Sequence, residues 1–242
     1  MSVVQAMLWD QDGTIIDTEK NLDLLNAQLL AEYDVIYDKS KKAQWTGKSD
    51  LEGLKLLAAS FAIDVAPEEL QRKRKPMQEQ WYAHDATYVP EFETFFERLY
   101  TTFSPAIALA SSCDLGYFSL LDRKLRLTER FNSNIFLAKE VQKKFPAGKF
   151  HGKPAPDLFI YAAQQLGVPM TRTAIVEDSP LGIVAGLRSG ARVIALVRTL
   201  PYVQLRSAVE NTLERSVAEG QEVLFIPDYS ELSFKDVKQY LS

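Results

Sequence analysis

A chain of 242 residues, of which 46% are hydrophobic and 25% charged, can bury a large core, either as one domain with an insertion or as two modest domains. Its formal net charge of −4 excludes a general attraction to nucleic acid or to anionic membranes, so we expect neither as a partner. Any phosphate-bearing ligand must therefore be held by a local cationic site.

The first predicted element is a short buried strand in the apolar stretch of residues 3–8. Asp10 and Asp12 follow it, and Gly13 marks the turn that ends it. In an open parallel sheet, ligands bind at the carboxyl ends of strands. Two carboxylates this close repel each other unless a cation or a proton lies between them, so the spacing favours a metal. Ordinary turns and calcium loops share the pattern, and both alternatives stay open at this point.

Residues 18–84 lose the strand signal and are rich in Leu, Ala, Lys, Glu and Gln with helical spacing, which predicts a helical insert. The run RKRK at 72–75 has the composition of a nucleic-acid patch, but we interpret it as a solvated helix face. A Ser-x-x-Glu capping box predicts that a helix starts at Ser49. Lys48, directly before it, is a candidate contact for an anionic or polyhydroxyl substrate.

Beyond residue 84, apolar strand-like runs alternate with helical ones, as in a parallel sheet built from βαβ units. The predicted strands are 106–110, 135–137, 174–176, 193–196 and 223–226, and the predicted helices are 115–121, 157–166, 181–189 and 234–241. Residues 201–220 are predicted as an additional helical stretch without an assigned function. The fold class is therefore α/β, a doubly wound parallel-sheet core of residues 1–17 and 85–242 with a helical cap, 18–84.

Polar groups follow two of the later strands. Ser111 and Ser112 come after strand 106–110, where a hydroxyl and a backbone N–H at a helix start can bind phosphate. Alternatively these serines, with Asp114, cap the next helix.

Glu177 and Asp178 follow strand 174–176 and can join a metal site, although Asp178 also fits the N-cap before Pro180. Between these strands, the stretch GKPAPD at 152–157 places Lys153 in a loop before a helix. A lone lysine in a loop is ordinarily exposed to solvent. The surrounding motif is the reason to interpret Lys153 as a functional residue.

Taken in order, these four motifs resemble the haloacid dehalogenase-like phosphohydrolases, in the branch with a small helical cap, and the resemblance covers nearly all of the chain. It implies that Asp10 is a nucleophile that forms an aspartyl-phosphate. Asp12 would be the acid–base group, with its backbone carbonyl as a metal ligand. Gln11 departs from the family, which usually has Phe or another apolar residue there.

The resemblance also assigns the remaining motifs. Ser111 and the Ser112 N–H would bind phosphate, and Lys153 would neutralise both the nucleophile and the transferring phosphoryl group. Asp178, with Glu177, would complete the oxygen shell of a Mg²⁺ ion.

We therefore predict a Mg²⁺-dependent phosphomonoesterase acting on a small phosphorylated metabolite, a sugar phosphate or a nucleoside monophosphate. Related sugar-phosphate mutases tend to carry arginine where this chain has Asp50, which disfavours that activity. The alternatives are a phosphosugar mutase of the β-phosphoglucomutase type and a non-catalytic phosphate-binding protein of the same fold.

The single cysteine, Cys113, excludes an intrachain disulfide and fits a reducing compartment. We expect it to be a packing residue, since no histidine is placed by the sequence to activate it. No secretory or membrane-spanning pattern is visible, so we expect a cytoplasmic protein. We also expect it to be a monomer.

Overall fold

The computed structural model describes residues 4–45 and 50–242, and the chain divides into two compact units. The sheet unit comprises Met1–Asp17 and Thr87–Ser242, and the helical unit comprises Thr18–Ala86. Each unit is described by itself below.

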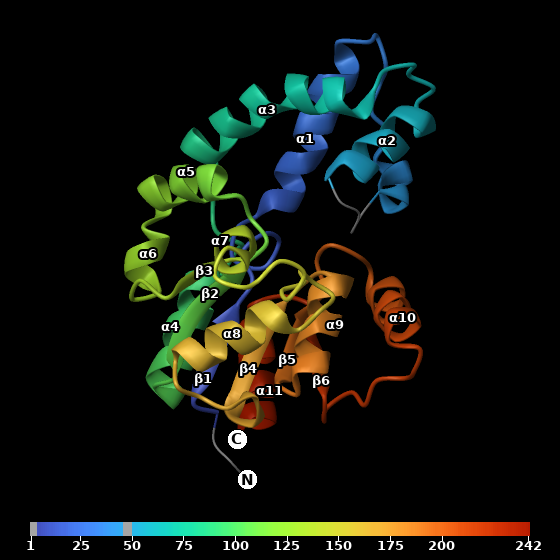
Figure 1. Ribbon diagram of the computed structural model, residues 1–242. Helices are drawn as coiled ribbons and strands as arrows, with labels where there is room; N and C mark the ends of the chain where they lie inside the picture. Colours follow the sequence, from blue (N-terminus) through green and yellow to red (C-terminus); the bar gives the residue numbers. More distant parts are fainter. Residues whose placement is uncertain (1–3, 46–49) are drawn as a thin grey trace. The chain divides into compact units, whose positions relative to one another are not determined.

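The sheet unit is built on six strands that pair in parallel (Figure 1). They are β1 (Ala6–Trp9), β2 (Ala106–Ser111), β3 (Ile135–Leu137), β4 (Thr173–Glu177), β5 (Arg192–Leu196) and β6 (Val223–Ile226). Their order is β3-β2-β1-β4-β5-β6, which confirms the predicted doubly wound sheet. The order reverses between β1 and β4, and a ligand crevice is expected there, outside the carboxyl ends of the strands.

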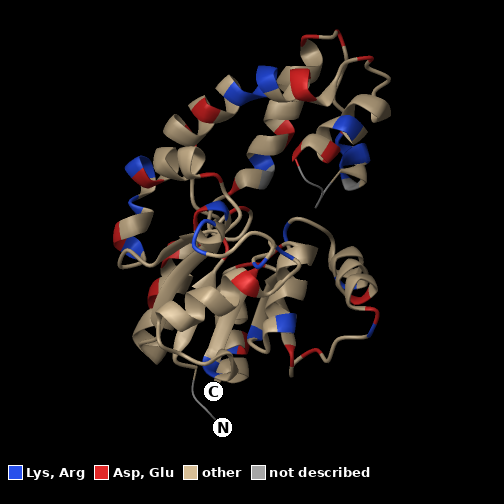
Figure 2. Cartoon of the chain, in the orientation of Figure 1, with Lys and Arg blue, Asp and Glu red and all other residues tan. Residues whose placement is uncertain are grey.

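The strands form where the sequence is apolar on both faces. Every residue of β1 and β4 is buried, as expected for a parallel sheet covered on both sides. Figure 2 shows the strands almost entirely in the colour of uncharged residues. The register pairs Leu8 with Ala108 on one side and with Ile175 on the other, so equivalent positions form rows across the sheet.

One face of the sheet is covered by α8 (Asp157–Gln165), α9 (Pro180–Ser189) and α10 (Tyr202–Leu213). Leu8 and Ile175 point toward this face and share a core cluster with Phe159 of α8 and Ala185 of α9. Helix α10 adds Leu205 and Val209 to a second cluster, formed with β5, β6 and α9. Small and branched residues therefore form the packing layer on this face, and they let the helices approach the sheet closely.

The opposite face is aromatic. Trp9 packs against Phe92 and Phe96 of α4 (Phe92–Phe103), with ring centroids 5.5 and 5.4 Å away. Phe95 packs on Phe234 of α11 (Glu231–Leu241), with ring centroids 6.0 Å apart. Helix α4 was absent from the predicted elements, although its buried residues recur at the helical period.

The remaining elements of the sheet unit are short or peripheral: α5 (Leu115–Leu125), α6 (Leu127–Arg130), α7 (Ala138–Gln142) and η2 (Met170–Arg172). Several predicted boundaries were wrong, among them those of the first strand and of the helix at 201–220. The first strand begins at Ala6, and Val4 is a buried residue before it. The predicted helix 201–220 ends at Leu213, because Glu214 has a positive φ of 56° and the chain then turns.

The helical unit consists of α1 (Thr18–Ala31), η1 (Lys39–Gln44), α2 (Asp50–Ser60) and α3 (Pro67–His84) (Figure 1). No strand occurs among its described residues. Leu29, Leu54 and Leu70 lie at the centre of its core. The interpretation of residues 72–75 as a solvated face was partly wrong, because Arg74 is buried against α2.

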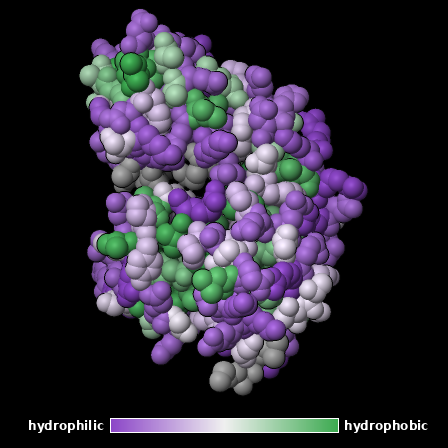
Figure 3. All heavy atoms as spheres, turned by 180° about the vertical axis from the view of Figure 1, so that it is seen from behind, coloured by the Kyte–Doolittle hydropathy of each residue, from purple (hydrophilic) through white to green (hydrophobic). Residues whose placement is uncertain are grey.

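Hydrophilic side chains cover most of the face drawn in Figure 3, with smaller hydrophobic groups between them. Large hydrophobic residues that are well exposed include Ile36, Val203 and Leu232. Among residues 4–45 and 50–242, no helix has the length and apolar character needed to cross a membrane.

Replacing Phe92 by alanine should destabilise the sheet unit by about 3 to 5 kcal/mol, because this fully buried ring contacts Trp9, Phe96 and Tyr229. Urea unfolding followed by circular dichroism measures the loss. Leu232→Ala, at a side chain that is 70% exposed, is the control and should change stability by less than about 0.5 kcal/mol. A loss below about 1 kcal/mol for Phe92→Ala would contradict this account of the aromatic face.

Candidate active site

Three buried carboxylates meet where the strand order reverses. Asp10 follows β1, Glu177 ends β4, and Asp178 is the next residue. Because Trp9 pairs with Val176, the parallel register brings Asp10 beside Glu177. One oxygen from each of the three carboxylates lies within 4.8 Å of the others. The sequence motifs at 10 and 177–178 are thus brought together in space.

Lys153 joins this cluster from the loop that precedes α8. Its Nζ donates to Asp10 Oδ1 and to Glu177 Oε1, the latter at 2.8 Å, and its side chain is only 8% exposed. Burial alone lowers the pKa of Lys153, but the attraction of Asp10 and Glu177 outweighs it and raises that pKa overall. The ammonium group is therefore charged at every physiological pH.

If all three carboxylates were ionised, the cluster would carry more negative than positive charge, since Lys153 is the cation that pairs with it, through Asp10 and Glu177. Burial raises the pKa of Asp10 to about 8, against the lowering effect of Lys153, and Glu177 raises it further. Burial also raises the pKa of Asp178, with Glu177 and Asp10 adding to the shift. Carboxylate oxygens in this arrangement are the donor set of a hard divalent cation, and such an ion would offset the excess charge.

Asp178 is held in place by two hydroxyls from distant segments. Thr14 Oγ1 donates to Asp178 Oδ1 at 2.9 Å, and Thr199 Oγ1 donates to Asp178 Oδ2. Tyr229 in turn donates to the Thr14 carbonyl at 2.9 Å. Thr199 and Tyr229 lie outside every sequence motif, so the sequence carried no signal that could have placed them at the site.

Two glycines make room for the carboxylates. A Cβ on Gly13, where φ is +80°, would lie 2.1 Å from Asp178 Oδ2, and one on Gly182 would lie 1.5 Å from Glu177 Oε1. Ser179 is the N-cap of α9, with its hydroxyl accepting from the Gly182 N–H at 3.1 Å. The alternative in which Asp178 is that N-cap is therefore wrong.

Asp12 lies in the tight turn after β1. Its Oδ2 accepts from Gln11 Nε2 at 3.3 Å, and the Gly13 N–H donates to the Ile16 carbonyl at 2.9 Å, closing the turn. Gln11 itself is fully buried, which is consistent with the apolar residue that the family usually has there. As a whole residue Asp12 is partly buried, whereas Asp10 is buried.

The two serines after β2 differ in their surroundings. Ser111 is buried, and its Oγ accepts from the Cys113 N–H at 2.9 Å. Asp114 caps α5 by accepting from the Gly116 N–H at 2.9 Å. Ser112 is exposed and precedes that cap, so the prediction that its N–H lies at the helix start was wrong.

Cys113 is buried, and burial raises the pKa of its thiol, which keeps it protonated. The expectation of a packing residue is consistent with that environment. Lys48 and Ser49 lie outside the described residues.

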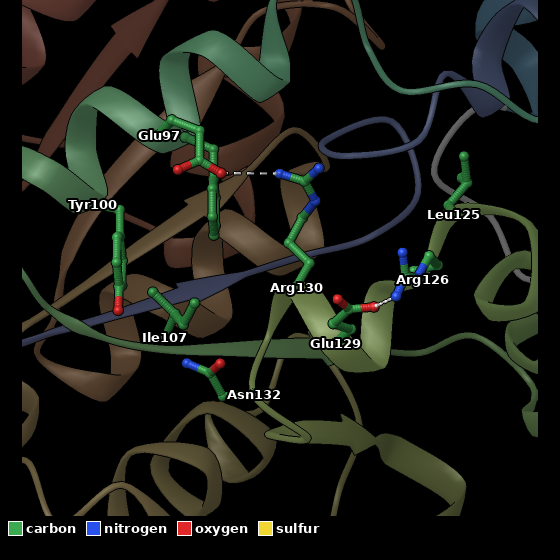
Figure 4. A pocket seen from close by; sticks show the side chains of 9 residues that line it. Glu97, Tyr100, Ile107, Leu125, Arg126, Glu129, Arg130 and Asn132 are labelled. Carbon is green, nitrogen blue, oxygen red and sulfur yellow. Dashed lines mark hydrogen bonds and ion pairs between the residues drawn. The ribbon is translucent and has the colours of Figure 1, made fainter.

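A cavity of about 390 Å³ elsewhere in the sheet unit is lined by residues of α4, β2 and the α5–α6 region (Figure 4). Its arginines already have partners. Arg130 pairs with Glu97 at 3.5 Å, and Arg126 pairs with Glu129. None of the three clustered carboxylates lines it, so it is distinct from the candidate active site.

The site geometry agrees with a comparison against protein families. The profile of the haloacid dehalogenase-like hydrolases matches residues 7–196, which include all four motifs. The chain belongs to this family. The resemblance inferred from the motifs is therefore confirmed, and with it the expectation of an enzyme.

Named relatives of this hydrolase are phosphatases. It is 25% identical over 194 residues to a probable pseudouridine-5'-phosphatase of Drosophila melanogaster, covering 79% of this chain and 80% of that protein. It is 24% identical over 185 residues to a fructose-1-phosphate phosphatase of Escherichia coli (strain K12), covering 76% and 92%. A solved haloacid dehalogenase family hydrolase of Deinococcus radiodurans R1, with bound phosphate and sodium, has 26% identity and a TM-score of 0.72, covering 100% and 98%.

Without a divalent cation, this hydrolase should lose stability as the pH rises from about 4 toward 8. The raised pKa of Asp10, about 8 against 3.8, means that the folded state binds this proton more tightly than the unfolded chain, so deprotonation disfavours folding. An added divalent cation should stabilise the fold more at about pH 8 than at about pH 6, because protons compete with it less. Unfolding temperatures measured at both pH values, with a chelator and with the added cation, report both effects. A stabilisation by the cation that does not change with pH would contradict the prediction. Asp10→Asn is the control that should weaken the trend.

Thr199→Val should weaken divalent-cation binding by about 10-fold or more, because Asp178 is expected to be a metal ligand and hydrogen bonds to such a carboxylate orient it. The valine keeps the shape of threonine but cannot donate to Asp178. Calorimetric titration measures the dissociation constant. Thr94→Val, at an exposed position of α4, is the matched control and should leave it unchanged. Equal constants for Thr199→Val and the wild type would show that Thr14 alone positions Asp178.

Proposed function

We propose that this protein is a Mg²⁺-dependent phosphomonoesterase that hydrolyses a small phosphorylated metabolite through an aspartyl-phosphate. The observation that supports it most directly is the buried group of Asp10, Glu177 and Asp178, of which the first two pair with Lys153. Such a group suits an anionic substrate that must be bound next to an anionic nucleophile.

Asp10 is the proposed nucleophile. Its Oδ1 is held by Lys153, and its backbone N–H donates to the Val176 carbonyl at 3.0 Å, so both the side chain and the backbone of Asp10 are fixed. A fixed carboxylate attacks phosphorus in line with the leaving oxygen, forming the new P–O bond as the ester P–O bond breaks. Lys153 neutralises the charge that builds up on the phosphoryl oxygens.

Asp12 is the proposed proton donor and acceptor. It protonates the leaving alcohol and then takes a proton from the water that hydrolyses the phosphoenzyme. Its place in the closed turn after β1 supports this role, because the carboxylate lies near enough to Asp10 to help raise the pKa of that residue.

Ser111 is proposed to bind a phosphoryl oxygen. Because its Oγ accepts from the Cys113 N–H, its own proton can be donated elsewhere. Its place at the end of β2, next to the strand that carries Asp10, supports this assignment. The Ser112 N–H is proposed as a second donor from the loop before α5.

Mg²⁺ would be held by the carboxylates of Asp10 and Asp178 and by the Asp12 carbonyl, with Glu177 behind them. When bound, the ion lets the Asp10 carboxylate approach phosphate and stabilises charge on its oxygens. The Glu177 carboxylate accepts hydrogen bonds from Lys153 Nζ and, at 2.6 Å, from the Ser179 N–H. These bonds support a role for Glu177 in orienting the lysine.

The substrate is proposed to be a sugar phosphate or a nucleoside monophosphate, in keeping with the named relatives. The helical unit is proposed as the cap that selects among them. Release of free phosphate, as opposed to an isomerised sugar phosphate, separates this activity from that of a mutase.

The two leading acids should respond differently to amidation. Asp10→Asn should abolish phosphoenzyme formation with every substrate, because no neighbouring group replaces the nucleophile. Asp12→Asn should lower the rate roughly 10²- to 10⁴-fold. The loss in the first step should be smaller with p-nitrophenyl phosphate, because its leaving group needs little protonation. Rapid-quench trapping with and without Mg²⁺ measures both steps.

Multiple turnover of p-nitrophenyl phosphate by the wild type, dependent on Mg²⁺, is the basic test of the proposal. A phosphoenzyme in Asp10→Asn would overturn the assignment of the nucleophile. Equal losses in Asp12→Asn for good and poor leaving groups would overturn the proton-transfer role.

A further inference from the structure

Tyr229 lies in the loop between β6 and α11, beyond residue 196, where the match to the family profile ends. It is buried, with 3% of the residue exposed. Its ring packs among aromatic side chains, with centroids 4.7 Å from Phe95, 5.9 Å from Phe92 and 6.4 Å from Trp9. A phenylalanine ring would make the same contacts, so packing alone does not account for the hydroxyl.

The Tyr229 hydroxyl begins a chain of two hydrogen bonds that ends on Asp178. It donates to the Thr14 carbonyl at 2.9 Å, and Thr14 Oγ1 donates to Asp178 Oδ1, also at 2.9 Å. Both bonds are buried, and they join segments that are 215 and 164 residues apart in the sequence. Thr14 therefore connects the C-terminal part of the chain to one of the three clustered carboxylates.

Thr14 lies in the tight turn after β1. The Ile15 and Ile16 N–H groups close this turn by donating to the Gln11 carbonyl, each at 2.9 Å. The bond from Tyr229 adds a fixed point at Thr14 itself, inside the turn. Because Oγ1 is attached to that residue, a shift of the Thr14 backbone would move the hydroxyl that donates to Asp178.

The protonation state of Tyr229 suits a permanent donor. Burial raises the pKa of its phenol, and the charge of Asp178 raises it further, against the lowering effect of Arg198. The phenol thus stays protonated and keeps its O–H at physiological pH. The influence of Asp178 also shows that the two side chains lie within electrostatic reach of each other.

We propose that Tyr229 is a positioning residue of the candidate divalent-cation site. It holds the Thr14 backbone, and Thr14 holds Asp178, the proposed metal ligand. The inference thus rests on the metal site of the proposed function. Tyr229 is not itself a ligand, and it acts as outer hydrogen-bond partners do, by fixing the orientation of a carboxylate that binds the metal.

Tyr229→Phe tests this role, because it keeps the ring and removes the hydroxyl. Calorimetric titration with Mg²⁺, at one pH and in one buffer, should show a dissociation constant raised about fivefold. Tyr240→Phe is the matched control. Its hydroxyl also donates to a backbone carbonyl, that of Gln221 at 3.4 Å, but Gln221 precedes β6 and lies at the opposite end of the strands. That variant should stay within about twofold of the wild type.

A double-mutant cycle with Thr14→Val tests the route. Thr14→Val removes the hydroxyl that Tyr229 is proposed to position, and it should raise the dissociation constant about tenfold. Combined with Tyr229→Phe, the loss should stay near about tenfold, because the phenol has nothing left to position. A combined loss near about fiftyfold would mean that the two residues act independently, and it would overturn the inference.

A purely structural role for the hydroxyl gives a different result. In that case Tyr229→Phe lowers the unfolding temperature without cation but leaves the dissociation constant unchanged, which overturns the inference. 4-Aminophenylalanine in place of Tyr229 supplies an N–H donor and should return the constant to within about twofold of the wild type. If Tyr229→Phe does not fold, Thr14→Val decides, since an unchanged constant would remove the route from Tyr229 to Asp178.

Failure of the two proposals is distinguishable, because calorimetry needs no turnover. If the wild type binds Mg²⁺ but hydrolyses no p-nitrophenyl phosphate, the proposed function fails, and the ratio of dissociation constants still decides the role of Tyr229. If hydrolysis is normal but Tyr229→Phe binds Mg²⁺ as tightly as the wild type, only this inference is overturned. A wild type that binds no Mg²⁺ also overturns it, whatever the rate of hydrolysis.

Discussion

The structure depends on an unbalanced group of buried charges. Asp10, Glu177 and Asp178 lie together, and a buried cation, Lys153, pairs with the first two in a place where water screens the charges little. Folding alone leaves this group unfavourable, as the raised pKa of Asp10 indicates. Unfavourable buried charges of this kind are concentrated at functional sites. Here the fold supplies negative charge that a bound divalent cation would offset.

The sheet determines which charges meet. Parallel register places the ends of β1 and β4 side by side, and the reversal of strand order keeps a crossover helix from covering that point. The aromatic packing of Trp9 on α4 fixes β1 from the opposite face. The position of Asp10 is therefore set by the core of the sheet unit, while Lys153 reaches it from a loop.

Much of this was predictable from sequence because the motifs are local. Apolar runs ending in acids or hydroxyls predicted the strands and placed Asp10, Ser111 and Asp178 at or just beyond their ends. The hydroxyl of Thr199 and the ion pair between Asp50 and Arg74 were not predictable, since each joins segments whose approach depends on tertiary packing. Helix α4 was overlooked for a different reason, as its aromatic period was present in the sequence.

Gly13 and Gly182 have a consequence for how this enzyme tolerates sequence change. Neither carries a functional group, yet any side chain at either position would occupy the space of an Asp178 or Glu177 oxygen. In a saturation mutagenesis experiment these two positions would score as intolerant as the acids themselves. Substitution at the site is therefore limited by the space beside the carboxylates as well as by the chemistry that the acids supply.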